Sequence, residues 1–193
     1  MRKSNVGLKK YPTIAACGLD CGLCPRFYTV GTSRCPGCAG PNFFAKHPSC
    51  SFITCCVKDK RLEVCAQCSD FPCSKFKTHE EYQHLKESPS YPPVRKILSN
   101  LIFIKNNGIE KFLVQQKLRM RFLKIMITKY DDGRSRGYYC RASALLDTTT
   151  LKSSIDKAML KIKAEDIKQT DRKGKAKILR TILDEYLSNV CTN

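Results

Sequence analysis

The sequence predicts a mainly α-helical protein with a small, irregular, cysteine-rich N-terminal module that has few or no regular strands. Eleven of the thirteen cysteines fall between Cys17 and Cys73, together with many Gly and Pro residues that interrupt any regular period. Beyond about residue 88, apolar residues recur at helical spacing instead. We therefore expect two parts, residues 1–88 and 89–193, which could also pack as one unit.

Four helices are expected in the second part, because each has an apolar stripe at i, i+3 and i+4 and a polar or glycine-containing end. Gly108 follows the first stripe and is suited to the left-handed conformation of a helix C-cap. The predicted helices cover residues 94–107, 109–130, about 149–162 and 176–190.

Composition excludes several classes of protein. Hydrophobic residues make up 42% of the 193 residues and charged residues 27%, which is typical of a globular chain rather than a disordered tail or a continuous coiled coil. The net charge of +18 favours an anionic partner. The polar N-terminal segment lacks the apolar core of a signal peptide, and no apolar run is long enough to span a bilayer. We expect a cytoplasmic protein without a membrane partner.

The cysteine spacing indicates metal binding. Three Cys-x-x-Cys pairs occur, and in such a pair one tight turn aims both sulfurs at a single ion, so two pairs complete a tetrahedral zinc site. A stretch of this size also needs metals or disulfides to supplement its apolar core. Two or more zinc ions are therefore predicted, and the candidate ligands are Cys17, Cys21, Cys24, Cys35, Cys38, Cys50, Cys55, Cys65, Cys68 and Cys73.

The division of these ligands among sites is open. One interpretation groups the first two pairs, Cys21 and Cys24 with Cys35 and Cys38, into a site like that of a zinc ribbon. The third pair would then join ligands taken from Cys50, Cys55 and Cys73. Of the adjacent Cys55 and Cys56, one is expected to ligate and the other to pack. The additional candidate ligands are Cys56 and Cys140.

An iron–sulfur cluster with a redox role is the alternative. The spacing Cys17-x3-Cys21-x2-Cys24 is that of the radical S-adenosylmethionine signature, but the chain lacks the length and the alternating strands and helices of such an enzyme. A simple cluster-binding module stays open, because zinc and iron–sulfur clusters both accept four cysteines in similar loops.

Three segments carry a resemblance to a known family: AACGLDCGLCPRFY, RCPGC and CAQCSDFPCSKF. They resemble a cysteine-rich family of bacteria and archaea, a domain of unknown function presumed to bind zinc, over residues 14–77. The segments NNGIEKFLVQQKLR and DGRSRGYYCRASALLD extend the similarity to about residue 160. The resemblance implies zinc binding but no reaction. Several relatives have further Cys-x-x-Cys pairs near the C-terminus, where this chain has only Cys140 and Cys191.

No phosphate-binding loop, nucleophile elbow or zinc-protease motif is present, and closed four-cysteine sites leave no position for a substrate. Binding or scaffolding is therefore favoured over catalysis. A second alternative is nucleic-acid binding through a basic helix, with its anion contacts at Lys117, Arg119, Arg121 and Lys124.

Overall fold

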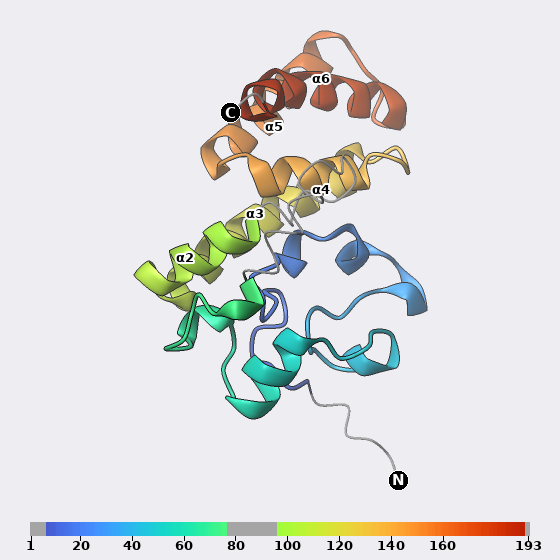
Figure 1. Cartoon of the computed structure of the whole chain (residues 1–193). Helices are drawn as coiled ribbons and strands as arrows, with labels where there is room; N and C mark the ends of the chain where they lie inside the picture. The colour runs from blue at the N-terminus through green and yellow to red at the C-terminus, as the bar shows by residue number, and fades with distance from the viewer. Residues whose placement is uncertain (1–6, 77–95, 192–193) are drawn as a thin grey trace. The chain divides into compact units, whose positions relative to one another are not determined.

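The computed structural model describes residues 7–76 and 96–191 (Figure 1). The described residues are mainly helical, as the sequence predicts, and the N-terminal region consists of short turns. No regular strand occurs within the described residues, where the one β-type pairing is an isolated bridge between Ile14 and Asp20.

The chain divides into two compact units, Met1–Leu113 and Val114–Asn193, and the division falls within helix α3 (Ile109–Tyr130). The boundary predicted near residue 88 lies outside the described residues.

The first unit begins with a series of tight turns. Gly and Pro residues limit each 3₁₀ turn to three or four residues, because they break the regular period. A π-helix, η5, follows and contains the adjacent Cys55 and Cys56. In order, these elements are η1 (Cys21–Leu23), η2 (Pro25–Tyr28), η3 (Gly31–Ser33), η4 (Phe43–Ala45), η5 (Ile53–Asp59) and η6 (Cys65–Gln67).

Helix α2 (Ile97–Asn107) packs against the cysteine-rich turns of the same unit. The shared core is apolar and contains Ile14, Val64, Phe71, Phe76, Leu101 and Ile104. The buried Asn100 donates a hydrogen bond of 2.9 Å from Nδ2 to the Gly18 carbonyl. The predicted C-cap is confirmed, since Gly108 has φ +83° and its amide donates to the Ile104 carbonyl. The cysteine-rich region thus uses a helix from beyond it to complete its core.

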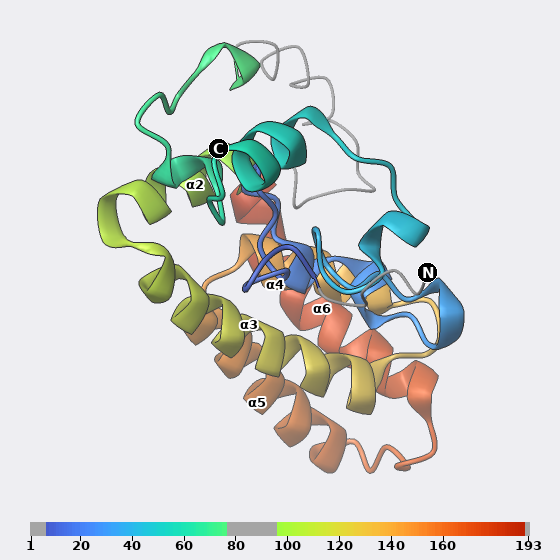
Figure 2. The ribbon, with the colours of Figure 1, turned by 90° about the horizontal axis from the view of Figure 1, so that it is seen from below.

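The second unit is a group of helices around buried aliphatic side chains such as Leu123, Leu151 and Leu179. Helices α5 and α6 run side by side (Figure 2). Asp147 caps α5 by accepting a hydrogen bond of 2.8 Å from the Thr150 amide. Besides the C-terminal part of α3, the helices are α4 (Arg136–Leu145), α5 (Thr148–Ala164) and α6 (Arg172–Cys191).

Helix α4 was not among the helices predicted from the sequence. Its segment contains Gly137 and two adjacent tyrosines, which are weak helix formers. Tertiary contacts stabilise it instead: Tyr138 donates to Asp184 Oδ1 at 2.6 Å, and the buried Tyr139 donates to the Tyr130 carbonyl at 3.1 Å. No helix among the described residues is both long and apolar enough to cross a membrane.

Candidate metal centre

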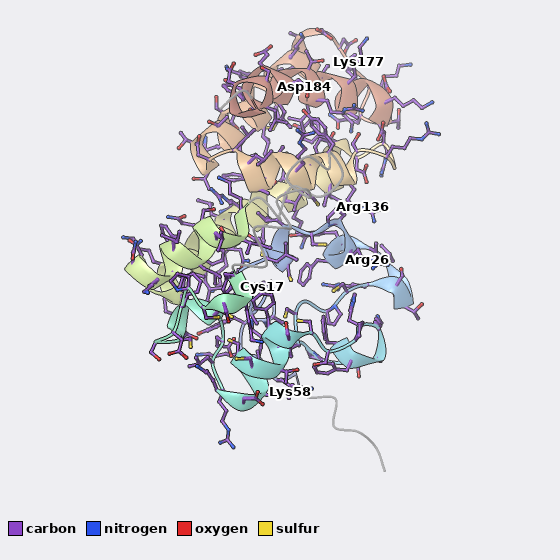
Figure 3. The ribbon with its side chains drawn as sticks, viewed as in Figure 1. Cys17, Arg26, Lys58, Arg136, Lys177 and Asp184 are labelled. Atoms are coloured by element: carbon purple, nitrogen blue, oxygen red, sulfur yellow. The ribbon has the colours of Figure 1, made fainter. Side chains whose placement is uncertain are left out.

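Nine of the eleven cysteines of the first unit are described here as two groups, and Cys17 connects them, since its charge also raises the pKa of Cys65. The first thiol group is defined here as Cys17, Cys21, Cys38 and Cys50, which lie close enough that the charge of one thiolate raises the pKa of another. Cys17 comes from the tight turn before η1, and Figure 3 shows it inside the cysteine-rich module. The thiolate charge of Cys24 likewise raises the pKa of Cys21, and that of Cys35 raises the pKa of Cys38.

Burial dominates the electrostatics of three thiols of the first group, Cys17, Cys21 and Cys38. Desolvation raises the pKa of Cys17 to about 11 and raises the pKa values of Cys21 and Cys38, because a buried thiolate loses its hydration. The backbone amides of Leu19, Cys38 and Ala16 act in the opposite direction and lower the pKa values of Cys17, Cys21 and Cys38 respectively. Amides directed at sulfur are a feature of thiolate sites, since they stabilise the charged form.

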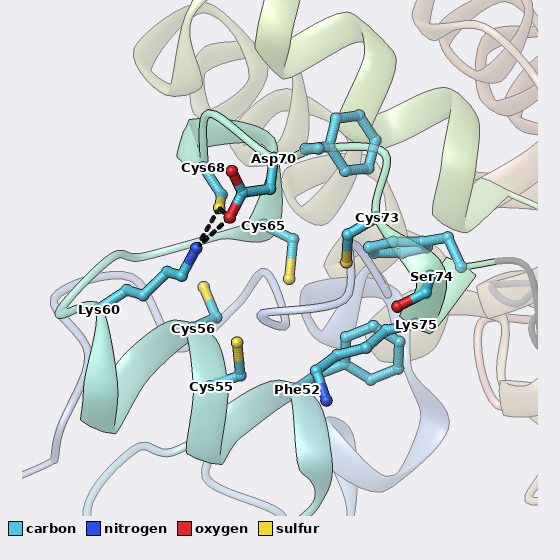
Figure 4. Close-up of a pocket in the computed structure, with 12 residues that line it drawn as sticks. Phe52, Cys55, Cys56, Lys60, Cys65, Cys68, Asp70, Cys73, Ser74 and Lys75 are labelled. Carbon is cyan, nitrogen blue, oxygen red and sulfur yellow. Dashed lines mark hydrogen bonds and ion pairs between the residues drawn. The ribbon is translucent and has the colours of Figure 1, made fainter.

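The second thiol group is defined as Cys55, Cys56, Cys65, Cys68 and Cys73, which line one pocket of about 200 Å³. Figure 4 shows Cys55 and Cys56 reaching it from η5, with the other three opposite. Phe52, Phe71 and Phe76 complete its apolar wall. Five soft sulfur donors in an apolar surrounding suit a thiophilic metal.

The π-helix explains how adjacent cysteines both reach this pocket. The Lys60 amide donates to the Cys55 carbonyl and the Leu62 amide to the Cys56 carbonyl, which fixes the widened turn at its end. π-Helical turns are rare and occur frequently at functional sites. The expectation that one of the two thiols ligates and the other packs stays a prediction, although both line the pocket.

Cys56 and Cys65 form a hydrogen-bonded thiol pair. The hydrogen bond to the Cys65 side chain lowers the pKa of Cys56, and the same bond raises the pKa of Cys65. The two pKa values shift in opposite directions because the hydrogen bond favours the charged form of the sulfur that accepts it.

Lys60 and Asp70 form the polar rim of the pocket. Lys60 Nζ lies 3.0 Å from Cys68 Sγ and 2.6 Å from Asp70 Oδ2 (Figure 4). The hydrogen bond to Asp70 is the main cause of the raised pKa of Lys60, and the same contact lowers the pKa of Asp70. A cation at this sulfur would disperse the charge of a thiolate ligand.

Lys9 lies buried near both thiol groups. The residue is 6% exposed, and its Nζ donates a hydrogen bond to the Ile14 carbonyl. Its charge lowers the pKa values of Cys38, in the first group, and of Cys56, in the second. None of the ion pairs found among the described residues involves Lys9. The Lys9 ammonium group therefore lies close enough to thiols of both groups to favour their charged forms.

Lys9, Lys60 and Asp70 were not predicted from the sequence. Lys60 and Asp70 flank the pair Cys65-x-x-Cys68, so a search for charged residues beside the knuckle would find them. Lys9 belongs to a polar N-terminal segment that contains three other basic residues, Arg2, Lys3 and Lys10. Nothing in the sequence marks Lys9 as buried.

The structure places eight of the ten predicted ligands in the two thiol groups, with Cys24 and Cys35 near the first, and their role as metal ligands stays a prediction. Cys50 associates electrostatically with Cys17 and Cys38, whereas Cys55, Cys65, Cys68 and Cys73 share the pocket. Cys140 lies buried in α4 of the second unit.

None of the twelve cysteines from Cys17 to Cys140, all of which the structure describes, takes part in a disulfide. Across residues 7–76 and 96–191, no three His, Cys, Asp or Glu side chains are positioned to hold a metal ion as they stand. Metal binding by either group therefore requires the thiols to turn toward a common point.

The four cations predicted as anion contacts lie on α3. Lys117, Arg121 and Lys124 are exposed, while Arg119 is half-buried and its Nε lacks a hydrogen-bond partner among the described residues. Their role in binding an anion stays a prediction.

Comparison with known proteins gives one match. Residues 13–78 match a family described as a protein of unknown function (DUF3795). The match covers the cysteine-rich region and confirms the resemblance for these residues, while the expected extension to about residue 160 stays a prediction. No curated protein and no solved structure matches the chain.

Proposed function

We propose that the cysteine-rich module holds two or more structural zinc ions, at least one at each thiol group, and that the protein acts in binding or scaffolding. The zinc ions would stabilise a small module with little regular structure, because metal binding contributes directly to its folding free energy. Thiolates are preferred ligands of zinc in structural sites.

The buried Lys9 is the observation that carries this proposal. A buried ammonium group costs several kcal/mol unless an anion compensates its charge. The Ile14 carbonyl satisfies a hydrogen bond of Lys9 but supplies no full charge. A zinc ion bound by four thiolates has a net charge of −2, so two such sites would provide the missing anions.

Replacing Lys9 tests the charge compensation. Lys9→Met keeps the length of the side chain and removes its charge. We expect the zinc dissociation constant to rise about tenfold, which corresponds to about 1.4 kcal/mol, as measured by competition with a chromophoric chelator. In the metal-free chain the same change should leave stability unchanged or raise it, because an uncompensated buried cation is removed.

Lys10→Met is the matched control, because Lys10 is the exposed neighbour of Lys9 and loses the same charge. It should change zinc affinity less than twofold. Equal effects of the two substitutions, or no effect of Lys9→Met, would contradict the compensating role of Lys9.

Zinc content tests the two sites separately. Cys21→Ser removes a thiol of the first group and Cys65→Ser one of the second. Each variant should lose about one zinc ion per chain by elemental analysis, and unfolding of the module should follow, since a structural zinc contributes about 10–16 kcal/mol. A variant with unchanged zinc content and an unchanged unfolding transition would contradict the assignment of that group.

An iron–sulfur cluster at the second thiol group is the alternative, and the size and lining of the pocket support it. Five thiols surround a cavity of about 200 Å³, which exceeds the space of one ion, and three phenylalanines would shield a cluster from water. Purification without oxygen separates the two proposals. A brown protein with iron and acid-labile sulfide selects the cluster, whereas a colourless protein with two or three zinc ions excludes it.

A further inference from the structure

A second pocket lies wholly within the unit Val114–Asn193, so its shape is independent of the cysteine-rich module. Its volume is about 760 Å³, within the range of about 300–1,000 Å³ that is usual for small-molecule sites. The end of α3, the second half of α5 with the loop that follows, and the first turn of α6 form its walls.

The charge of this pocket is strongly positive. Its cations are Lys129, Lys163, Lys168, Arg172 and Lys175, and its only carboxylate is that of Asp166. The side chains of the first three of these lysines make no hydrogen bond or ion pair within the described part of the chain. Like charges gathered in a concave site raise its positive potential and attract anions.

One of the cations is buried and held by a backbone carbonyl, and a second approaches one. Lys175 is 9% exposed, and its Nζ donates to the Gln169 carbonyl at 2.7 Å. Arg172 Nη1 lies 3.5 Å from the Asp131 carbonyl. A carbonyl orients a cation without neutralising it, so Lys175 offers a fixed positive charge to a ligand.

Part of the pocket lining is apolar, and this part, which consists of Met159, Ile162 and Ile167, is called the apolar floor here. After α5, the Ile167 amide donates to the Ile162 carbonyl at 3.0 Å and the Asp166 amide to the Lys163 carbonyl at 3.3 Å, which is the Schellman pattern of a helix end. Ile162, Ile167 and Met159 line the pocket beside the cations. The site thus combines an apolar surface with convergent positive charge.

We propose that this pocket binds a small organic molecule that bears two or more phosphate groups. The cations would bind the phosphates, and the isoleucine floor would contact the apolar part of the ligand. The hollow shape favours a small molecule over a nucleic acid, which would meet the exposed lysines on the rim and leave the buried Lys175 without a phosphate. This proposal is independent of the metal bound by the cysteines.

The test uses the full metal-loaded chain with inorganic pyrophosphate and ATP as probes, measured by isothermal titration calorimetry. Both probes should bind, and ATP should bind more tightly because its organic part reaches the apolar floor. Lys163→Gln combined with Lys168→Gln should weaken both at least about tenfold, since two charge-assisted contacts with phosphate oxygens are lost.

Lys152→Gln combined with Lys177→Gln is the matched control. It removes the same charge from exposed sites outside the pocket, and Figure 3 shows Lys177 on α6. The control should weaken binding less than twofold, and circular dichroism should show both double variants folded. Equal weakening by both variants would reduce the interaction to non-specific attraction and overturn the proposal.

Three further outcomes would overturn it. The pocket would be no phosphate site if neither probe bound at low ionic strength. Pyrophosphate binding as tight as that of ATP would remove the role of the apolar floor. Oligonucleotide binding that depends on Lys163 and Lys168, with no ATP binding, would assign the surface to nucleic acid instead.

Discussion

Gly18 shows how a single residue connects the cysteine turns to the helical core. Its φ of +93° is rarely adopted by residues with a side chain. A Cβ atom at this position would lie 2.6 Å from the Ile97 carbonyl oxygen and 2.6 Å from Leu101 Cγ. The absence of a side chain therefore allows α2 to approach the turn that carries Cys17.

Gly18→Ala should destabilise the first unit. The backbone conformation alone costs about 1–2 kcal/mol for a residue with a Cβ, and the contact with α2 adds about 1–3 kcal/mol of overpacking. Gly31→Ala is the control, because Gly31 also has positive φ but a Cβ atom there would have no other atom within 4 Å. Urea unfolding of both variants at equal zinc content should give the larger loss for Gly18→Ala. Equal losses would show that α2 does not press on this turn.

At the scale of elements, the N-cap of α5 links stability to pH. The Thr150 amide and hydroxyl both donate to Asp147, and these bonds lower the pKa of its carboxyl group. The pKa of this carboxyl group is thus lower in the folded chain than in the unfolded chain, where it is about 3.9. The cap therefore stabilises the protein fully above about pH 3.9, and this stabilisation is lost as the pH falls through the pKa of the folded chain.

Asp147→Ala should therefore reduce the stability of the second unit by about 1 kcal/mol at neutral pH. The difference from the unsubstituted chain should shrink as the pH falls below about 4, because the native carboxyl group then becomes protonated. Thermal unfolding followed by circular dichroism at several pH values measures both effects. A difference that stayed constant down to strongly acidic pH would contradict a charge-dependent cap.

Helix ends with a local chemical signal could be predicted from the sequence. Gly108 ends α2 and the turn after Tyr130 ends α3, because glycine and aspartate determine the backbone there regardless of tertiary contacts. Helix α4 could not be predicted, since it depends on Tyr138 reaching Asp184, which lies 46 residues away.

The candidate metal centre also has features that the sequence predicts and features that depend on packing. The spacing of the Cys-x-x-Cys pairs predicted that thiols would gather, because that spacing is a local property. The association of Cys50 with Cys17 and Cys38 depends on how the turns pack, and the spacing does not encode it. The orientation of Cys56 depends on a π-helix, for which the sequence has no simple signal.

At the scale of the whole molecule, the two units differ in what stabilises them. The first unit combines short turns and two modest apolar clusters with eleven cysteines. The second contains helices whose buried side chains are mostly aliphatic, among them Leu123, Leu151, Leu179 and Leu183. If zinc stabilises the first unit, only the folding of that unit should require bound metal.

Removing the metal should therefore unfold one unit and leave the other folded. We expect a strong zinc chelator to abolish the protection of amides in residues 7–76 against hydrogen exchange, while amides in α5 and α6 stay protected. Mass spectrometry of exchanged peptides measures both regions in one experiment, and added zinc should restore the lost protection. Simultaneous loss in both units would mean that they fold as one cooperative structure, and undiminished protection of residues 7–76 would mean that the thiols are not structural ligands.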